Sequence, residues 1–442
     1  MQKVLSTVAE RNGGEHEFLD AVREVAISLQ PFFKEHQNMI RIFEQICEPE
    51  RQVMFRVAWL DDDNCLQVNR GFRIQFNSAI GPYKGGIRYH PTVNASIIKM
   101  LGFEQIFKNA LTTLPLGGAK GGADFNPKGR SDGEIQRFCQ SFMTELVRHI
   151  AEDMDVPAGD IGVGSREIGY LFGQYRRLSG RFQGAITGKE LPYGGSLCRP
   201  EATGYGVVML TEEMLKDKND DIKGKRCAVS GSGNVALHCA RKLVKSGAIV
   251  LAISDSQGTL VEPEGFSYEQ LLDIQNVKMD RKARLSECCT KSSKHFGDGQ
   301  HPWKLEELGD IDLAFPCATQ GELDEDEVDS LARKGCKAVV EGANMPTTAA
   351  GVARLHQHNI LYVPGKMANA GGVAVSGLEM AQNRTMQAWT ADEVYEKLKN
   401  IMRDIYTTAK KCAEQYSVDL NAGANIAAFL KVGEAVKAQG AV

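Results

Sequence analysis

Three lysines in the first 120 residues could together bind a small anionic molecule. Lys84 lies in GPYKGGIRYH, Lys108 in FEQIFKNAL and Lys120 in PLGGAKGGAD, and two of the three are followed directly by a Gly-Gly pair. Taken singly, each could be a surface lysine in a turn or on a helix. Taken together, several ammonium groups in one closed cleft would hold a small dicarboxylate. Their repulsion would also favour the neutral amine and lower a lysine pKa towards the range of a general base.

The stretch PLGGAKGGAD places Lys120 among four glycines. Glycine loses more backbone entropy on folding than any other residue, so this density indicates a tight bend or a close approach to the main chain. A phosphate-binding loop is excluded because the order GxxxxGK[ST] is absent. We therefore expect a small-residue turn that delivers the Lys120 amine. Asp160, in DVPAGDIGVG, is a candidate proton carrier, with a turn cap as its alternative role.

A second motif predicts a dinucleotide site. In RCAVSGSGNVALHCARKLVKSGAIVLAISD, an apolar run leads into a glycine turn, a helical segment and a second apolar run that ends at Asp255. The first glycine permits the turn, the second lets the backbone approach a pyrophosphate, and Ala236 replaces the third. The helix N-terminus would offer its free N–H groups to the phosphates. The turn residues predicted to bind the dinucleotide are Gly231, Ser232, Gly233, Asn234 and Val235.

The residues after this motif leave the choice between NAD and NADP open. Asp255 would ordinarily accept a hydrogen bond from the ribose 2′-hydroxyl and repel a 2′-phosphate, which favours NAD. Ser256 and a basic cluster of Lys278, Arg281 and Lys282 are donors that a 2′-phosphate could use, which favours NADP. The basic cluster could equally be a solvated helix face.

The periodicity of apolar residues predicts an α/β protein with two domains. Helical spacing covers residues 17–47, 95–111, 132–151 and 391–415, and strands are expected at 55–60 and 66–77 around the turn 61–64. From Arg226 onwards, short apolar runs alternate with helical segments, which is typical of a doubly wound parallel sheet. We expect a first domain at 1–198, a Rossmann-type dinucleotide-binding domain at 199–365, and C-terminal helices at 366–442 that return to the first domain. The active site is expected in the cleft between the domains.

The charge, the cysteine content and the apolar runs of the sequence limit the kinds of partner and compartment that we expect. The formal net charge of −4 gives no bulk signal for nucleic acid or an anionic membrane surface. The eleven cysteines include no CxxC pair, which argues against a zinc ribbon or a disulfide framework and favours a reducing compartment. No apolar run reaches the ~18 residues that a membrane span needs. We expect a cytoplasmic protein that uses no metal and binds neither nucleic acid nor a membrane.

Seven segments, in order along the chain, resemble the glutamate dehydrogenases, and the small hexameric type of bacteria and lower eukaryotes in particular. The resemblance extends from about residue 15 to the C-terminus. The segments are GPYKGGIRYHPTV, LPLGGAKGGADFNPKG, DVPAGDIGVGSREIGY, RPEATGYG, PCATQGELD, EGANMPTT and ANAGGVAVSGLEMAQN.

This resemblance implies the reversible oxidative deamination of L-glutamate to 2-oxoglutarate and ammonia, with hydride transfer to a nicotinamide cofactor. Lys120 would be the catalytic lysine that activates water, and Asp160 would relay protons to and from the amino group. Lys84 and Ser376 would bind the side-chain carboxylate, and Lys108 with Gln105 the α-carboxylate. The main chain at Ala158 and Gly159 would border the substrate, and Val373 would pack against its methylene groups.

The resemblance also implies the cofactor and the assembly. SDSQGT, at residues 254–259, is similar to NADP-preferring members, in which Ser256, Lys278 and Arg281 would face the 2′-phosphate despite Asp255. A homohexamer would form through the first domain, which would serve in substrate binding and oligomerisation. The residues expected to line the nicotinamide and its ribose are Thr203, Ala318, Thr319, Asn344 and Asn369.

The alternatives are an NAD-dependent glutamate dehydrogenase and a leucine or phenylalanine dehydrogenase. The latter enzymes share the catalytic lysine and aspartate but lack a cationic side-chain binder, so Lys84 and Ser376 favour glutamate. A nucleotide-binding regulator without turnover would have no use for Lys108, Lys120 and Asp160, and a purely structural protein would leave the cost of the glycines unexplained.

Overall fold

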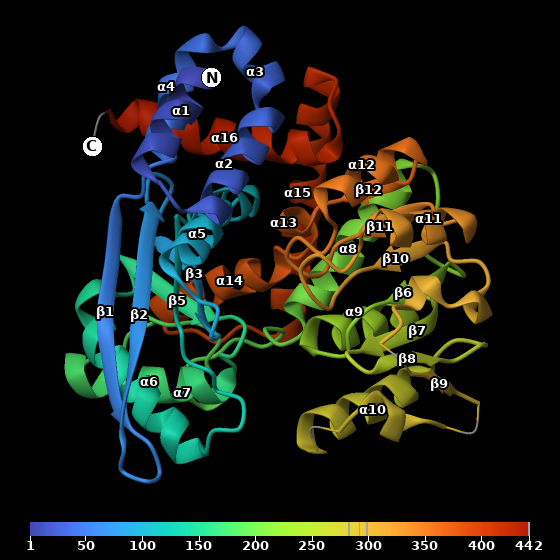
Figure 1. The fold of residues 1–442 in the computed structure, drawn as a ribbon, viewed down its shortest axis with the longest axis horizontal. Helices are drawn as coiled ribbons and strands as arrows, with labels where there is room; N and C mark the ends of the chain where they lie inside the picture. The colour runs from blue at the N-terminus through green and yellow to red at the C-terminus, as the bar shows by residue number, and fades with distance from the viewer. Residues whose placement is uncertain (282, 291, 298, 441–442) are drawn as a thin grey trace. The chain divides into compact units, whose positions relative to one another are not determined.

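The structure is a computed structural model that describes residues 1–281, 283–290, 292–297 and 299–440, with the side chains of residues 279–281 left aside. Backbone contacts divide the chain into two compact units. Unit 1 comprises Met1–Arg199, Val373–Tyr395 and Thr408–Val442, and unit 2 comprises Pro200–Gly372 and Glu396–Thr407. Figure 1 shows the helices and strands of both units.

Unit 1 is built on a five-stranded mixed sheet of order β1-β2-β4-β3-β5. The pairs β1–β2 and β2–β4 are antiparallel, whereas β3 runs parallel to both β4 and β5. The strands are β1 (Arg51–Leu60), β2 (Leu66–Asn77), β3 (Tyr83–Tyr89), β4 (Gly118–Ala123) and β5 (Asp155–Gly159). The helices before the sheet are α1 (Gln2–Arg11), α2 (His16–Ser28), α3 (Gln30–Glu35) and α4 (Ile40–Ile46).

The two predicted strands around residues 61–64 form the long β1–β2 ribbon (Figure 1). The carboxylate of Asp61 closes the turn, because its Oδ1 accepts hydrogen bonds from the amides of Asp63 and Cys65. An isolated glycine inside a strand run, such as Gly71, predicts a bulge or a bend, but Gly71 pairs regularly with Phe55. A Cβ at this glycine would lie 2.3 Å from the Phe55 ring, so the glycine makes room for an aromatic side chain and the bulge prediction is wrong.

The predicted turn around Lys120 is also wrong, because PLGGAKGGAD contains β4, the central strand of the sheet. A Cβ at Gly118 would lie 2.6 Å from Cγ1 of Ile106, in the helix α5 (Ala95–Leu111) that packs on this strand. A Cβ at Gly122 would lie 2.6 Å from the carbonyl oxygen of Arg88 in β3. The glycines therefore serve close packing of a helix and a neighbouring strand, and not a change of chain direction.

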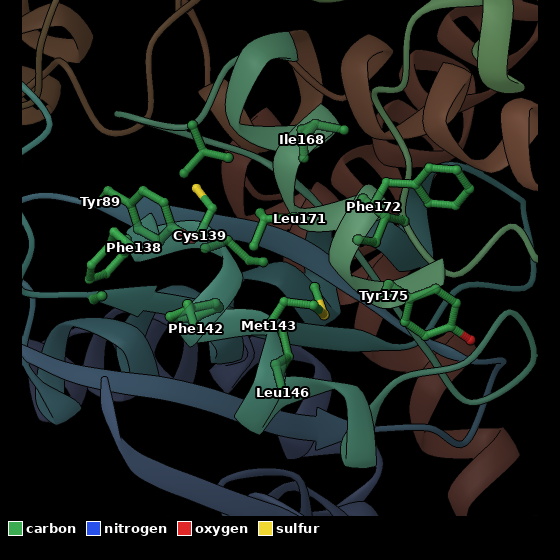
Figure 2. Packing of buried hydrophobic residues seen from close by; sticks show 14 of the residues in the cluster. Tyr89, Phe138, Cys139, Phe142, Met143, Leu146, Ile168, Leu171, Phe172 and Tyr175 are labelled. Carbon is green, nitrogen blue, oxygen red and sulfur yellow. The ribbon is translucent and has the colours of Figure 1, made fainter. Parts of the chain in front are cut away.

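A large apolar core forms around α6 (Asp132–Leu146) and α7 (Ser165–Ser179). Figure 2 shows Phe138 and Phe142 of α6 beside Tyr89 of β3, and Leu171 of α7 in the same cluster. The helix predicted at 132–151 begins in the capping box of Ser131 and ends at Leu146, where the 3-10 turn η2 (Val147–His149) follows. The strand residues of this core come from β1, β3 and β4.

Unit 2 contains the predicted doubly wound sheet, with strand order β12-β11-β10-β6-β7-β8-β9. Five strands are parallel, and β8 and β9 add an antiparallel edge. The strands are β6 (Arg226–Val229), β7 (Ile249–Asp255), β8 (Gly258–Val261), β9 (Lys294–Phe296), β10 (Leu313–Phe315), β11 (Ala338–Val340) and β12 (Leu361–Val363). The helices are α8 (Ala202–Asp217), α9 (Asn234–Lys245), α10 (Tyr268–Arg281), α11 (Glu325–Arg333), α12 (Ala349–Gln357) and α13 (Gly365–Ala368).

The C-terminal region is helical: α14 (Gly371–Thr385), α15 (Ala391–Tyr416) and α16 (Leu420–Gln439). The last helix belongs to unit 1, where Nδ2 of Asn425 donates to Oγ of Ser28 over 3.0 Å. The remaining 3-10 turns are η1 (Gln37–Met39), η3 (Leu191–Tyr193), η4 (Leu285–Cys288), η5 (Pro302–Lys304) and η6 (Glu306–Leu308). In the part of the chain that the structure describes, no helix is long and apolar enough to cross a membrane.

Candidate active site

Lys120 and Asp160 meet across strand β3. Lys120 lies in β4 and Asp160 directly follows β5, with β3 between the two strands. Nζ of Lys120 lies 3.3 Å from Oδ2 of Asp160. A Cβ at Gly86 of β3 would stand 3.2 Å from that Nζ and 2.8 Å from Cβ of Asp160. The absence of a side chain at Gly86 is therefore what lets the amine and the carboxylate touch.

A third charge joins this pair. Nε of Arg88 donates to Oδ2 of Asp160 over 2.8 Å. Burial opposes ionisation of Asp160, but the charges of Lys120 and Arg88 outweigh it and lower its pKa to about 2. Burial lowers the pKa of Lys120 as well; Asp160 opposes this shift and Arg88 adds to it. The group combines an ionised carboxylate with an amine whose proton is held weakly.

Lys108 belongs to the same charge cluster. It lies near the end of α5 and is half-buried. Burial first, and then the charge of Lys120, lower the pKa of Lys108 to about 8. Gln105, one helical turn earlier, donates from Nε2 to Oδ1 of Asn109 over 2.7 Å. Asn109 in turn donates to the carbonyl oxygens of Lys84 and Gly117, which ties α5 to β3 and to the segment before β4.

Lys84 is buried at the start of β3 with two hydrogen-bond acceptors. Its Nζ donates to the carbonyl oxygen of Val156 (2.9 Å) and to Oγ1 of Thr187 (2.7 Å). Burial, followed by the charge of Arg199, sets the pKa of Lys84 well below its usual range. Nε of Arg199 donates to Oγ of Ser376 over 3.0 Å. Two cationic side chains and two hydroxyl groups, all in unit 1, thus form a cluster suited to a carboxylate.

The main chain at Ala158 and Gly159 is part of β5, where these residues pair with Gly86 and Ile87 of β3. A Cβ at Gly159 would lie 2.4 Å from the carbonyl oxygen of Val163, so this position accepts only glycine without a shift. Val373 is half-buried and stands one helical turn before Ser376 on α14. These positions border the lysine clusters of unit 1 with small or apolar groups.

In unit 2, the predicted strand–turn–helix of the dinucleotide motif is confirmed as β6, α9 and β7. Gly231 has a left-handed φ of +87°, and a Cβ there would lie 3.1 Å from Cα of Ala318. Its amide donates to Oγ of Ser254 over 3.0 Å. Gly233 caps α9, is exposed, and has open space where a Cβ would stand. The exposed start of a helix behind a glycine turn is a preformed site for a pyrophosphate. Ser232, Asn234 and Val235 occupy the same turn.

The carboxylate of Asp255 is held by several donors. Lys278 lies 3.3 Å from Oδ2, and the amides of Leu285 and Gln257 donate to the two oxygens over 3.0 and 2.9 Å. Burial opposes the shift, yet these donors lower the pKa of Asp255. Oγ of the exposed Ser256 accepts from Nη1 of Arg284 over 3.0 Å. Lys282 and the side chain of Arg281 lie outside the described residues.

Asn344 and Asn369 contact each other near the carboxyl ends of β11 and β12. Nδ2 of Asn369 donates to Oδ1 of Asn344 over 2.8 Å, while Oδ1 of Asn369 is buried without a partner among the described residues. Ala318 and Thr319 are exposed after β10, and their amides donate to Oε1 of Glu322. Thr203 lies in the first turn of α8.

Four residues in these clusters had no role assigned from the sequence: Arg88, Thr187, Arg199 and Arg284. Arg88 follows Lys84 by four residues and Gly86 by two, so strand periodicity would have placed its side chain on their face. Arg199 stands within RPEATGYG, but nothing in its spacing predicts the contact with Ser376. Thr187 and Arg284 carry no local signal. Among the described residues, no group of three or more His, Cys, Asp or Glu could hold a metal ion.

Comparison with known proteins agrees with both units. Residues 194–440 match the family model described as Glutamate/Leucine/Phenylalanine/Valine dehydrogenase, and residues 49–177 match the Glu/Leu/Phe/Val dehydrogenase dimerisation domain. The chain is 58% identical to the NADP-specific glutamate dehydrogenase of Chlorella sorokiniana, over 100% of this chain and 84% of that protein. It is 52% identical to the enzyme of the same name from Giardia intestinalis, over 100% and 99%.

Among solved structures, the glutamate dehydrogenase of Plasmodium falciparum superposes with a TM-score of 0.98 at 50% identity, over 100% of this chain and 95% of that one. Both domains of the family are thus present, over the whole length of the chain and in the same fold. The chain therefore belongs to the glutamate/leucine/phenylalanine/valine dehydrogenase family.

Proposed function

We propose that this protein is an NADP-dependent glutamate dehydrogenase, which converts L-glutamate reversibly into 2-oxoglutarate and ammonia. One observation carries the proposal: unit 1 holds three lysines with lowered pKa values, of which Lys108 and Lys120 share the ionised Asp160, while Lys84 lies near Arg199. An excess of buried cations over anions requires an anionic ligand for balance. A dicarboxylic amino acid has the two negative charges and the amino group that this arrangement suits.

The side-chain carboxylate of the substrate would bind Lys84, Arg199 and the hydroxyl of Ser376. For this, the Lys84 amine would exchange its hydrogen bond to Thr187 for one to the carboxylate. Burial lowers the pKa of Lys84, and an entering carboxylate would restore its charge. Lys108, assisted by Gln105, would bind the α-carboxylate. The main chain at Ala158 and Gly159 would border the substrate, and Val373 would pack on its methylene groups.

The chemical steps follow from the Lys120–Asp160 pair. Asp160, ionised beside Arg88, would accept a proton from the substrate ammonium group. When bound, NADP supplies the acceptor for the hydride that leaves the α-carbon. The neutral amine of Lys120 would then take a proton from the water that attacks the resulting iminium carbon. Asp160 would return its proton to the nitrogen as the C–N bond breaks and ammonia leaves, and the carboxylate so formed would take the hydroxyl proton as the carbonyl of 2-oxoglutarate forms. A lysine with a lowered pKa suits this use because a general base works best near the pH of the reaction.

The residues of unit 2 fit NADP. The turn from Gly231 to Gly233 is open at the start of α9, as a pyrophosphate requires. The charge of Asp255 is compensated by Lys278 and by two main-chain amides. Its repulsion of a 2′-phosphate would therefore be reduced. Ser256 and Arg284 offer donors beside it, and Arg281 would add a third.

The other predicted cofactor residues also have suitable chemistry. The unpaired, buried Oδ1 of Asn369 suits a donor on the nicotinamide carboxamide or on its ribose. Asn344, Thr203, Ala318 and Thr319 would complete this side of the cofactor. Ser232, Asn234 and Val235 would contact the pyrophosphate from the glycine turn.

A coenzyme assay tests this proposal. The purified protein should oxidise NADPH in the presence of 2-oxoglutarate and ammonium, more efficiently than it oxidises NADH. Replacing 2-oxoglutarate with 2-oxoisocaproate should abolish most of the rate, because an isobutyl side chain offers nothing to Lys84 and Arg199. A preference for 2-oxoisocaproate would instead identify a leucine-type dehydrogenase. Binding of NADPH without any oxidation would identify a regulator.

We further propose a homohexamer that works in the cytoplasm in nitrogen assimilation. The match of residues 49–177 to a dimerisation domain and the resemblance to hexameric enzymes support the assembly. Four large apolar side chains of the β1–β2 ribbon are exposed in the single chain, namely Met54, Leu60, Leu66 and Val68. Sedimentation equilibrium should give a mass six times the 48.4 kDa of one chain. A monomer across the micromolar range would contradict the hexamer.

A further inference from the structure

Arg88 contacts Asp160 of the Lys120–Asp160 pair, although the proposed function assigns it no role of its own. It lies on β3 at two residues from Gly86, so its side chain shares the face on which Lys120 and Asp160 meet. The side chain is only 13% exposed, and Nε donates to Oδ2 of Asp160 over 2.8 Å. An arginine held at this depth, against the carboxylate that serves the chemistry, is not a solvated surface charge.

Arg88 and Lys120 share one oxygen atom. Oδ2 of Asp160 accepts from Nε of Arg88 and lies 3.3 Å from Nζ of Lys120. The guanidinium of an arginine does not lose its proton in proteins, whereas a buried lysine does so readily. Arg88 is therefore the permanent partner of the carboxylate, and Lys120 is the partner that can become neutral.

We propose that Arg88 is a positioning residue for the reaction: it holds Oδ2 of Asp160 beside Lys120 and balances the carboxylate when Lys120 gives up its proton. This inference rests on the proposed function, because it takes the catalytic roles of Lys120 and Asp160 from there. It adds a residue for which neither the resemblance nor the motifs provided a role.

Charge counting gives the physical reason. With Arg88 present, the three groups carry one surplus positive charge, and loss of the Lys120 proton leaves a neutral Arg88–Asp160 pair. Without Arg88, the same loss would leave a bare carboxylate in a buried site, which is strongly unfavourable. The amine of Lys120 would then hold its proton more tightly. Arg88 thus favours the neutral amine that a general base must offer.

The other charges around the pair do not replace Arg88. Arg73 also acts on Lys120, but its Nε and Nη2 donate to the two oxygens of Asp155, so its charge is compensated. Lys108 is a neighbour whose own pKa is about 8, so it loses its charge as the pH rises through that value. Glu104 and Arg199 also act on Lys108. Arg88 is the permanent charge in contact with Asp160.

The test uses the neutral variant Arg88→Gln and the charged variant Arg88→Lys in the full chain. The matched control is Arg70→Gln, because Arg70 also pairs with an aspartate through Nε, at 3.1 Å from Asp124, but is exposed on β2. Far-UV circular dichroism and NADPH fluorescence titration check that each variant folds and binds cofactor in unit 2.

The direct readout is the titration of Lys120 itself. Competitive labelling with acetic anhydride over a series of pH values, followed by peptide mass spectrometry, reports the pKa of this amine without any turnover. Arg88→Gln should raise that pKa by about 1 unit or more. Arg88→Lys and Arg70→Gln should leave it close to the value in the unmodified protein.

The kinetic readout is the pH dependence of glutamate oxidation. In Arg88→Gln, kcat at neutral pH should fall at least about tenfold, and the rising limb of kcat/KM should move to higher pH, so that activity partly returns in alkali. In Arg88→Lys the limb should stay in place while kcat falls, because an ammonium group retains the charge but not the position of Nε. A residue with only a structural role would lower the rate equally at every pH.

The proposal is overturned if Lys120 titrates in Arg88→Gln as it does in the unmodified protein, or if the pH profile is only scaled down. Should Arg88→Gln fail to fold, the neutral variant Arg88→Met decides: a raised Lys120 pKa supports the proposal, and a Lys120 pKa equal to that of the unmodified protein overturns it. If the unmodified protein does not oxidise NADPH with 2-oxoglutarate and ammonium, the proposed function fails. The labelling of Lys120 still reports the charge effect of Arg88 in that case.

Discussion

Nζ of Lys84 donates a hydrogen bond of 2.7 Å to Oγ1 of Thr187, and both side chains are fully buried. The two hydrogen-bond acceptors of the lysine are neutral, and the charges of Glu379 and Asp155 raise its pKa by less than burial and Arg199 lower it. Arg199 lies close enough to lower the pKa of Lys84 further. A further negative charge is what a substrate carboxylate would supply, so this contact is the basis for the expected selectivity.

The first prediction concerns substrate selectivity. Lys84→Leu should lower kcat/KM for glutamate by at least about a hundredfold and improve turnover of apolar amino acids such as norleucine, because an unpaired carboxylate would have to be buried. Steady-state assays with both substrates measure the ratio. Thr187→Val, which keeps the ammonium group, should cause a smaller loss. Unchanged preference for glutamate in Lys84→Leu would argue against this position for the side-chain carboxylate.

The second prediction concerns the catalytic base. Lys120→Ala should lower kcat by about a thousandfold or more, since general base catalysis is lost. Binding of NADPH, measured by fluorescence titration, should stay within a factor of two, because unit 2 is not altered. The exposed Lys128 in the same unit provides the control Lys128→Ala, with full activity expected. Substantial turnover in Lys120→Ala would exclude the assigned role.

The third prediction concerns the coenzyme. Arg284→Ala should lower kcat/KM for NADPH by about tenfold or more, which corresponds to a lost charge-assisted hydrogen bond, and leave NADH unaffected. The physical reason is that Arg284 donates to Ser256, next to Asp255, where the 2′-phosphate would lie. Lys218→Ala, at an exposed lysine of the same unit, is the control for net charge. Equal losses with both coenzymes would mean that Arg284 does not meet the 2′-phosphate.

The fourth prediction is a pH dependence. Burial and Lys120 lower the pKa of Lys108 to about 8, so its ammonium form is present below that pH and is lost as the pH rises through it. The kcat/KM for 2-oxoglutarate should therefore decline above about pH 8. In Lys108→Arg the decline should disappear or move to higher pH, because a guanidinium keeps its charge. A decline that is identical in Lys108→Arg would assign the titration to another group.

The fifth prediction concerns stability. Arg73 and Asp155 form a fully buried ion pair in unit 1, and Nη1 of Arg73 also donates to the carbonyl oxygen of Gly85. Asp155→Asn should lower the free energy of unfolding by about 3 kcal/mol or more, since it leaves a buried guanidinium without its counter-charge. Asp124→Asn, at the partly exposed pair with Arg70, should cost less than about 1 kcal/mol. Denaturant unfolding with both variants measures the difference.

Several elements could be predicted because their signals are local. The helices predicted at 95–111 and 391–415 are Ala95–Leu111, which is buried over most of its length, and Ala391–Tyr416, whose apolar residues keep the 3.6-residue period. The turn at Gly231 is local too, because a left-handed φ next to a helix start is a property of a few consecutive residues. The segments around the lysines that resemble the family can likewise be recognised from consecutive residues.

The glycines around Lys120 show where local reasoning fails. Four glycines in ten residues predict a turn, yet three of them lie in a central strand, because the space that they leave is filled by Ile106 of α5 and by the main chain of β3. Which atoms approach a glycine depends on segments far away in the sequence. The packing role of these glycines therefore could not be predicted from the local sequence.

The sequence by itself determined the residue types available for chemistry, the dinucleotide turn and the membership of a family, because each depends on identity and local spacing. The tertiary structure decided which charges share an atom. Arg88 lies in β3, Lys120 in β4 and Asp160 directly after β5, and only the β4-β3-β5 order, with Gly86 between, brings the two cations to one oxygen of Asp160. Charge interactions depend on distance in space, and a sequence records only distance along the chain.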